Sequence, residues 1–256
     1  MNATDIPFAR PSSTVILTRD GEKAPEFCLV RRHEQATFGG AYVFPGGVVD
    51  EADHSIDRRC VDIDPADADR ILNVQGEGLG YYVAAVRELF EEAGVLIANE
   101  ISCDDELDAV RRALNSGALQ WNRFVSEQRL RLACSTLRYF SHWITPDVIP
   151  KRFSTRFFLA RMPDAQHACH DDGEVTDTIW TTADHALESA RDGRLKLHFP
   201  TIKTIENLAR FPTVDDLEDW ASRCEKSGVV AIQPVMPGGD PKACPEIRDI
   251  RQGPFE

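Results

Sequence analysis

The chain has little positive charge for its length and no long apolar run. Lys and Arg together number 29 against 42 Asp and Glu, which gives a formal net charge of −13 at pH 7. This balance argues against binding nucleic acid or an anionic membrane through a broad basic surface. No apolar stretch is long enough to span a bilayer, so we expect no transmembrane segment and no membrane partner.

Paired cysteines and targeting signals are also missing. The seven cysteines are odd in number and scattered, without a C-x-x-C pair, which is typical of reduced thiols and not of a disulfide framework or a zinc site. The opening MNATDIPFARPSS lacks the charged start and apolar core of a signal peptide, and the closing RQGPFE carries no peroxisomal or ER-retention address. We therefore expect a cytoplasmic protein, and we leave a homodimer open.

Strand-like and helix-like segments alternate along the 256 residues, which predicts an α/β (α+β) fold. Strands are expected at 13–19, 26–32, 138–146, 152–162 and 174–182, with a further one inside GGAYVFPGG at 39–47. Helices are expected at 81–93, 183–191, 200–210 and 213–226, and within 105–131 with a break near Gly117. We expect an extended tail after Ser227, and the chain has no internal repeat.

The segment AAVRELFEEAGV at 84–95 places three like charges on one side of one helix. At about 100° per residue, Glu88, Glu91 and Glu92 fall within a sector of roughly 100°, beside a separate apolar face. Like charges at this spacing destabilise a helix, so either the face is merely solvated or a cation lies on it. Magnesium prefers oxygen ligands and is commonly shared by carboxylates, water and substrate phosphates. Arg87 lies four residues before Glu91 and can hold that carboxylate in place.

RELFEEAGV resembles the second half of the Nudix signature, R-E-U-x-E-E-x-G-U, where U is a bulky apolar residue. FPGGVVDEAD at 44–53 resembles the strand that leads into that signature. With Gly47 as the first signature glycine, the acidic position falls on Asp53, and the spacer from His54 to Val86 has 33 residues where the family has seven. We therefore interpret the sequence as a Nudix box divided by an insertion at about 54–80.

An insertion inside the box resembles the coenzyme A diphosphatase subfamily, as do RRHEQATFGGAYVFPGG and WITPDVIPKRFSTRFFLA. The resemblance implies an α/β/α sandwich with a mixed sheet, formed by one domain over 1–256. Its core would span about 12–210, and a C-terminal helical extension and tail would occupy about 211–256. The insertion is rich in Asp and poor in aromatic residues, which predicts a mobile, solvated excursion at the rim of the site that acts as a lid.

The resemblance also implies roles for individual residues. The catalytic candidates are Arg87, Glu88, Glu91 and Glu92, and the three glutamates are the expected ligands of Mg²⁺ or Mn²⁺. The substrate-binding candidates are Arg32, Gly46, Gly47 and Arg152. Asp53 is either a surface acid of the insertion or a residue near the metal, and Glu174 matches a loop acid that reaches the metal in some Nudix enzymes. Because Arg31 and Arg32 alternate on a strand, only one of them can face a ligand.

The expected function is metal-dependent hydrolysis of a small nucleoside-diphosphate-linked molecule. Coenzyme A or acyl-CoA is the first candidate, and the products would be 3′-phosphoadenosine 5′-phosphate and (acyl-)phosphopantetheine. One alternative is a diphosphatase for ADP-ribose, a dinucleotide or a sugar nucleotide. A second alternative is a Nudix module that binds a ligand without hydrolysing it.

Overall fold

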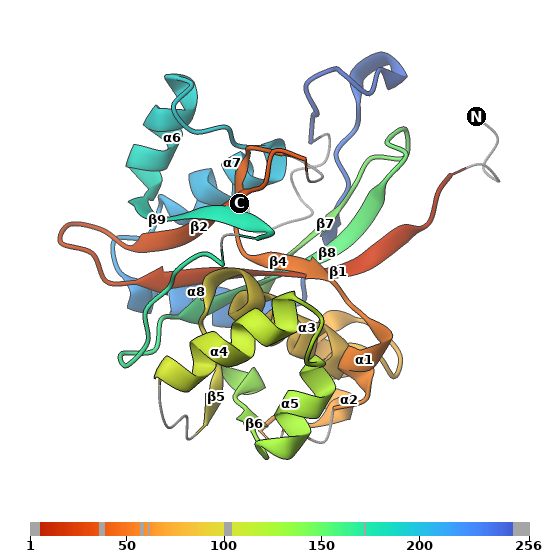
Figure 1. Cartoon of the computed structure of the whole chain (residues 1–256). Helices are drawn as coiled ribbons and strands as arrows, with labels where there is room; N and C mark the ends of the chain where they lie inside the picture. Colours follow the sequence, from red (N-terminus) through yellow and green to blue (C-terminus); the bar gives the residue numbers. More distant parts are fainter. Residues whose placement is uncertain are drawn as a thin grey trace.

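The computed structural model describes residues 6–35, 39–56, 59–60, 62–99, 104–171 and 173–247, and a mixed β-sheet runs through its centre (Figure 1). The strands are β1 (Ala9–Arg19), β2 (Glu26–Arg32), β3 (Tyr42–Val43), β4 (Gly46–Val48), β7 (Arg138–Ile144), β8 (Arg152–Arg161), β9 (Val175–Thr182) and β10 (Ala231–Ile232), with β5 (Ala98–Asn99) and β6 (Arg131–Leu132) forming a separate pair. The helices are α1 (Glu51–His54), α2 (Pro65–Leu72), α3 (Gly78–Ala93), α4 (Asp104–Asn115), α5 (Trp121–Glu127), α6 (Ala183–Arg191), α7 (Phe199–Leu208) and α8 (Val214–Ser227).

The sheet is mixed because two of its pairings are parallel. The order is β10-β7-β8-β1-β2-β3, with β4 paired to β1 and β9 paired to β2. β1 lies parallel to β8 and β10 lies parallel to β7, whereas the other neighbours are antiparallel. β1 pairs with β2 only at Thr18 and Arg19, and farther back along β1 its partner is β4 at Ser12–Thr14. The sheet therefore opens between β1 and β2, where β4 brings Gly46 and Gly47 next to α3.

Helices cover both faces of the sheet, as the α/β/α prediction requires (Figure 1). One core lies between the sheet and α2, α3, α4 and α5, and includes Tyr82, Leu89 and Phe158. The other lies between the sheet and α6, α7 and α8, and includes Phe157, Ile205 and Leu217. Strand alternation divides the two cores, because neighbouring residues of β8 such as Phe157 and Phe158 point to opposite faces. The predicted fold class is confirmed.

The expected element boundaries hold in most places, with informative differences. α3 begins at Gly78, three residues before the predicted start, and the helical stretch at 105–131 is divided into α4 and α5. The tail after Ser227 is not wholly extended, because it contributes β10 and a 3-10 turn at Pro237–Gly239. In the part of the chain that the structure describes, none of the helices combines the length and the apolar character needed to cross a membrane.

The expectation of a solvated excursion is wrong in part: many of the described residues between 54 and 80 are exposed, but the segment also packs into the core. Ile56, Cys60, Ala68 and Leu72 are each at most 5% exposed and belong to the core under α3. Asp69 of α2 accepts hydrogen bonds from the backbone N–H groups of Gly76, at 2.6 Å, and Gly78, at 2.7 Å. The apolar residues were hidden from sequence reasoning because they are spaced singly among many aspartates. The insertion therefore supports the N-terminus of α3.

Candidate active site

The last two turns of α3 carry the three glutamates, and the helix is fixed at its C-terminus. Gly94 adopts a left-handed conformation with φ of 73°, and its N–H donates to the Phe90 carbonyl. Arg111 of α4 is 4% exposed and donates from Nε to the Glu91 carbonyl at 2.9 Å and from Nη2 to the Glu92 carbonyl at 2.7 Å. A guanidinium at this end satisfies carbonyls that the helix leaves unpaired and complements its dipole. Sequence reasoning missed Arg111, because no local pattern links α4 to α3.

Arg87 is the centre of a network that includes the acid at position 53. Its Nε and Nη2 donate to Oδ1 and Oδ2 of Asp53, both at 2.9 Å. Its Nη1 donates to Glu88 Oε1 at 2.7 Å and to Glu91 Oε2 at 3.1 Å, and Nη2 also donates to the Val48 carbonyl at 2.9 Å. Asp53 is fully buried, so of the two readings left open for it, the surface acid does not hold.

The two glycines of β4 bring main chain against the carboxylates. The Gly46 N–H donates to Glu92 Oε2 at 2.9 Å, and a Cβ at Gly47 would lie 2.3 Å from Glu88 Oε1. A side chain at position 47 would therefore displace Glu88 from its present place. Arg32 donates from Nη1 to Glu92 Oε1 at 3.4 Å and from Nη2 to Glu174 Oε1 at 2.5 Å. Arg31 points away and pairs with Glu34, so Arg32 is the strand arginine that faces the glutamates.

Burial makes the negative charge of these carboxylates costly. It raises the pKa of Glu88 to about 7, against the opposing effect of the Arg87 guanidinium, and Glu91 raises it further. Burial also raises the pKa of Glu91, although Arg87 opposes the shift. The pKa of Glu92 is well above its usual range, because burial and the nearby Glu88 outweigh Arg32 and the Gly46 N–H. A divalent cation at this place would favour the charged forms and relieve that cost.

The donor set fits a hard cation in chemistry, although the side chains are not gathered around one point. Three carboxylates supply oxygen ligands of the type that Mg²⁺ and Mn²⁺ take. Across the described ranges, no group of three His, Cys, Asp or Glu side chains is arranged to hold a metal ion. The reason is visible in their partners, since Glu88 and Glu91 turn to Arg87 whereas Glu92 turns to Gly46 and Arg32. Arg87 contacts only one oxygen of Glu88 and one of Glu91, so each carboxylate has a second oxygen with which it could bind an ion.

A pocket of about 370 Å³ lies beside Glu88 and brings most of the substrate-binding candidates together. The substrate-binding candidates Arg32, Gly46 and Gly47 line it together with the loop acid Glu174, and Arg10 and Lys151 add two further cations at its wall. Sequence reasoning missed these two because they become neighbours only through the parallel pairing of β1 with β8, in which Arg10 lies opposite Phe153.

Arg152 does not line this pocket. Because alternate residues of a strand face opposite sides, Arg152 points away from the side on which Phe153 and Thr155 line the pocket. Its guanidinium donates to the Thr145 carbonyl at 3.1 Å, the Pro7 carbonyl at 2.7 Å and Asp147 Oδ1 at 2.5 Å. These contacts hold Arg152 in the protein and away from the pocket. They do not favour the prediction that Arg152 binds substrate, which the structure leaves untested.

The fold and the helix carboxylates beside a Gly-Gly strand define the chain as a Nudix hydrolase. A solved NUDIX hydrolase from Alicyclobacillus acidocaldarius shares the fold with a TM-score of 0.66, at 24% identity, over 84% of this chain and 97% of that one. The family model described as NUDT19 Nudix domain matches residues 66–208, which is more than half of the chain. The chain belongs to this family of Nudix pyrophosphohydrolases.

The chain is also similar to vertebrate proteins named acyl-coenzyme A diphosphatase NUDT19. The protein from Xenopus laevis is 22% identical over 272 residues, which cover 90% of this chain and 72% of the relative. The protein from Homo sapiens is 29% identical over 249 residues, which cover 81% of this chain and 66% of the relative. The chain therefore spans about two thirds to three quarters of the length of these relatives.

Proposed function

We propose that this chain is a metal-dependent diphosphatase of coenzyme A or acyl-CoA. The reaction would release 3′-phosphoadenosine 5′-phosphate and (acyl-)phosphopantetheine. The observation that carries the proposal is the pocket beside α3, where Glu88 meets the cations Arg10, Arg32 and Lys151. Carboxylates for a metal and cations for phosphates are both needed to bind a diphosphate next to its hydrolytic centre. The name of the NUDT19 relatives supports the choice of substrate.

Nudix hydrolases in general use divalent metal ions, and we assign Mg²⁺ or Mn²⁺ to Glu88, Glu91 and Glu92. When bound, such an ion polarises a phosphoryl oxygen and lowers the pKa of a coordinated water. The chain's own residues supply position and charge. Arg87 keeps Glu88 and Glu91 in place, Gly47 leaves room for Glu88, and one of the three carboxylates accepts the proton of the attacking water.

Arg32 is placed to bind a phosphate oxygen. Its Nε is buried and has no hydrogen-bond partner among the described residues, which leaves a donor beside the pocket for a ligand. Its present partner Glu174 is 59% exposed, so that pairing can be exchanged for a substrate anion at modest cost. Glu174 would then be released toward the metal, which is the role that the resemblance suggested for it.

The test is a substrate panel with product identification by mass spectrometry. The panel contains CoA, octanoyl-CoA, ADP-ribose, a dinucleoside polyphosphate and a sugar nucleotide, each with Mg²⁺, with Mn²⁺ and with EDTA. We expect cleavage of CoA or octanoyl-CoA into the two named products, only with metal, and kcat/KM at least about tenfold above that of the other compounds. Preference for ADP-ribose or a dinucleotide would replace the proposed substrate. Binding of CoA without turnover would support the non-catalytic alternative.

Two further expectations belong to the same proposal and need separate measurements. A cytoplasmic location follows only from the sequence and is tested by fractionation of the source cells. A homodimer is tested by light scattering of the purified chain across a range of concentrations.

A further inference from the structure

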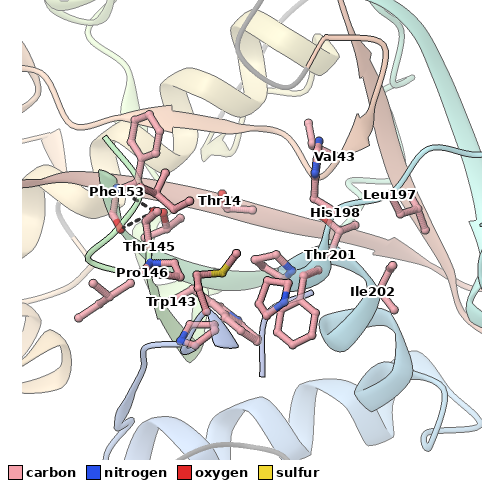
Figure 2. A pocket seen from close by; sticks show the side chains of 18 of the residues that line it. Thr14, Val43, Trp143, Thr145, Pro146, Phe153, Leu197, His198, Thr201 and Ile202 are labelled. Atoms are coloured by element: carbon pink, nitrogen blue, oxygen red, sulfur yellow. Dashed lines mark hydrogen bonds between the residues drawn. The ribbon is translucent and has the colours of Figure 1, made fainter. Parts of the chain in front are cut away.

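A second and larger cavity adjoins the pocket that contains Glu88. Its volume is about 590 Å³, and Thr14, Val43, Phe44, Phe153 and Thr155 line both spaces. The two cavities therefore meet along β1, β8 and the segment between β3 and β4. Figure 2 shows the view into the larger cavity, with Trp143, Thr145 and Pro146 on one side and Leu197, Thr201 and Ile202 on the other.

The larger cavity differs from its neighbour in charge. None of the described residues that line it is Asp, Glu, Lys or Arg, whereas the smaller pocket contains Arg10, Arg32, Lys151, Glu88 and Glu174. His198 adds no cation at neutral pH, because burial and the neighbouring Lys196 lower its pKa. Aromatic and aliphatic side chains such as Phe199 and Ile202 form most of the wall, with Thr145 and Thr201 as polar groups.

The wall of this cavity is partly built by the C-terminal segment. Pro234, Met236 and Pro245 line it, and all three lie beyond residue 208, where the match to the NUDT19 Nudix domain model ends. β10 holds this segment against the sheet through its parallel pairing with β7. The chain therefore contributes to the cavity with residues outside the part that identifies its family.

We propose that the larger cavity binds the neutral arm of the substrate, the pantetheine chain and the first carbons of its acyl group, while the diphosphate lies beside Glu88. The inference rests on the proposed function and assigns a subsite to each end of the substrate. The nucleotide end of coenzyme A carries a 3′-phosphate, and placing that dianion in a cavity without cations would carry a large desolvation cost. The pantetheine arm has no charge, so its amides can bond to threonine hydroxyls while its carbon chain covers the apolar wall.

The experiment uses Ile202→Trp to fill the cavity from α7. Glu206→Trp is the matched control, because it places the same side chain on the same helix at an exposed position that does not line this cavity. Circular dichroism and thermal melting establish that both variants are folded. KM is then measured for CoA and for acetyl-, butyryl- and octanoyl-CoA, and inhibition constants are measured for the two products separately.

In the wild type, KM should fall along the acyl series by up to about fourfold per buried methylene until the cavity is full, which is the affinity equivalent of burying a CH₂. In Ile202→Trp the series should be flat, and inhibition by octanoyl-phosphopantetheine should weaken at least about tenfold. Inhibition by 3′-phosphoadenosine 5′-phosphate should be unchanged, and Glu206→Trp should behave as the wild type.

Two results would overturn the assignment while leaving the function intact. Ile202→Trp could weaken inhibition by 3′-phosphoadenosine 5′-phosphate and leave inhibition by octanoyl-phosphopantetheine unchanged, which would place the nucleotide in the cavity. Alternatively, it could leave both inhibitors and the acyl series unchanged. If the wild type cleaves no CoA compound, the proposed function fails. Calorimetry with octanoyl-pantetheine then tests separately whether the cavity binds this arm. Binding that Ile202→Trp abolishes would uphold the subsite, and absence of binding would remove it.

Discussion

Arg87 and Asp53 form a two-point ion pair in which Nε meets Oδ1 and Nη2 meets Oδ2, both at 2.9 Å. The pair joins the two halves of a motif that are separated by 33 residues in the sequence. Asp53 also accepts a hydrogen bond from the backbone N–H of Asp50 at 2.8 Å, so the end of β4 and the short α1 are fixed to α3 together. Through this contact, the segment before the insertion is held against α3, where Arg87 also binds Glu88 and Glu91.

The first prediction concerns the carboxylates and the metal. Glu91→Gln and Glu92→Gln should each lower kcat by about two orders of magnitude or more, since several kcal/mol of transition-state stabilisation would be lost. Folding should be intact, because each change removes a partly or fully buried charge from a repulsive cluster. Steady-state rates with Mg²⁺ and calorimetric titration of the metal provide the measurements.

The control for the carboxylates is Glu127→Gln, an exposed change on α5 that should have no effect on rate or on metal affinity. Near-wild-type turnover in both Glu91→Gln and Glu92→Gln would remove these residues from the proposed metal site.

A second prediction concerns Arg87. Arg87→Lys keeps the charge but cannot contact Asp53, Glu88, Glu91 and the Val48 carbonyl at once. We expect kcat to fall by about an order of magnitude or more through misplacement of the carboxylates, and the thermal midpoint to fall as well. Rates are measured well below the melting temperature, so that the two effects separate. Equal activity of Arg and Lys at this position would show that only its charge matters.

A third prediction separates Lys151, which lines the pocket, from the next residue, Arg152, which does not. Lys151→Gln should raise KM by about tenfold with little change in kcat, because a cation is removed from the wall of the pocket beside Glu88. Arg152→Gln should instead lower the thermal midpoint, because it removes the hydrogen bonds that Arg152 donates to Asp147 and to two backbone carbonyls. KM values and melting curves of both variants distinguish a role in substrate binding from a role in stability. A specific rise in KM for Arg152→Gln would restore it as a substrate-binding residue.

The sequence predicted the parts of the site that lie within one element. Glu88, Glu91 and Glu92 share a face of α3 because helical geometry fixes their angles, and the alternation along β2 places Arg32 and Arg31 on opposite sides. Residues that meet only through tertiary pairing could not be predicted. Arg111 reaches the end of α3 from another helix, and Arg10 joins Lys151 through a parallel strand pair. For Arg152, strand alternation predicts which residues of β8 share its face, but not which face of the strand lies against the pocket.

The same limit explains the error about the insertion. Its many aspartates indicate a solvated segment, but composition cannot show that Asp69 faces the backbone N–H groups of Gly76 and Gly78. Nor can it show that single apolar residues such as Leu72 enter the core beneath α3.

The last prediction follows from this correction. Replacing residues 55–76 with a short Gly/Ser linker would remove Ile56, Cys60, Ala68 and Leu72 from the core, and with them the Asp69 cap of α3. We expect the cooperative thermal transition to be lost, so that catalysis and metal binding disappear together.

Point variants test the same relationship within a folded chain. Leu72→Ala should reduce the free energy of unfolding by about 2–5 kcal/mol, and Asp69→Ala by about 1 kcal/mol. Asp67→Ala, on the exposed side of α2, is the control and should change stability little. A truncated chain with native circular dichroism, an unchanged melting temperature and altered KM alone would show that the insertion acts as a lid and not as a support for α3.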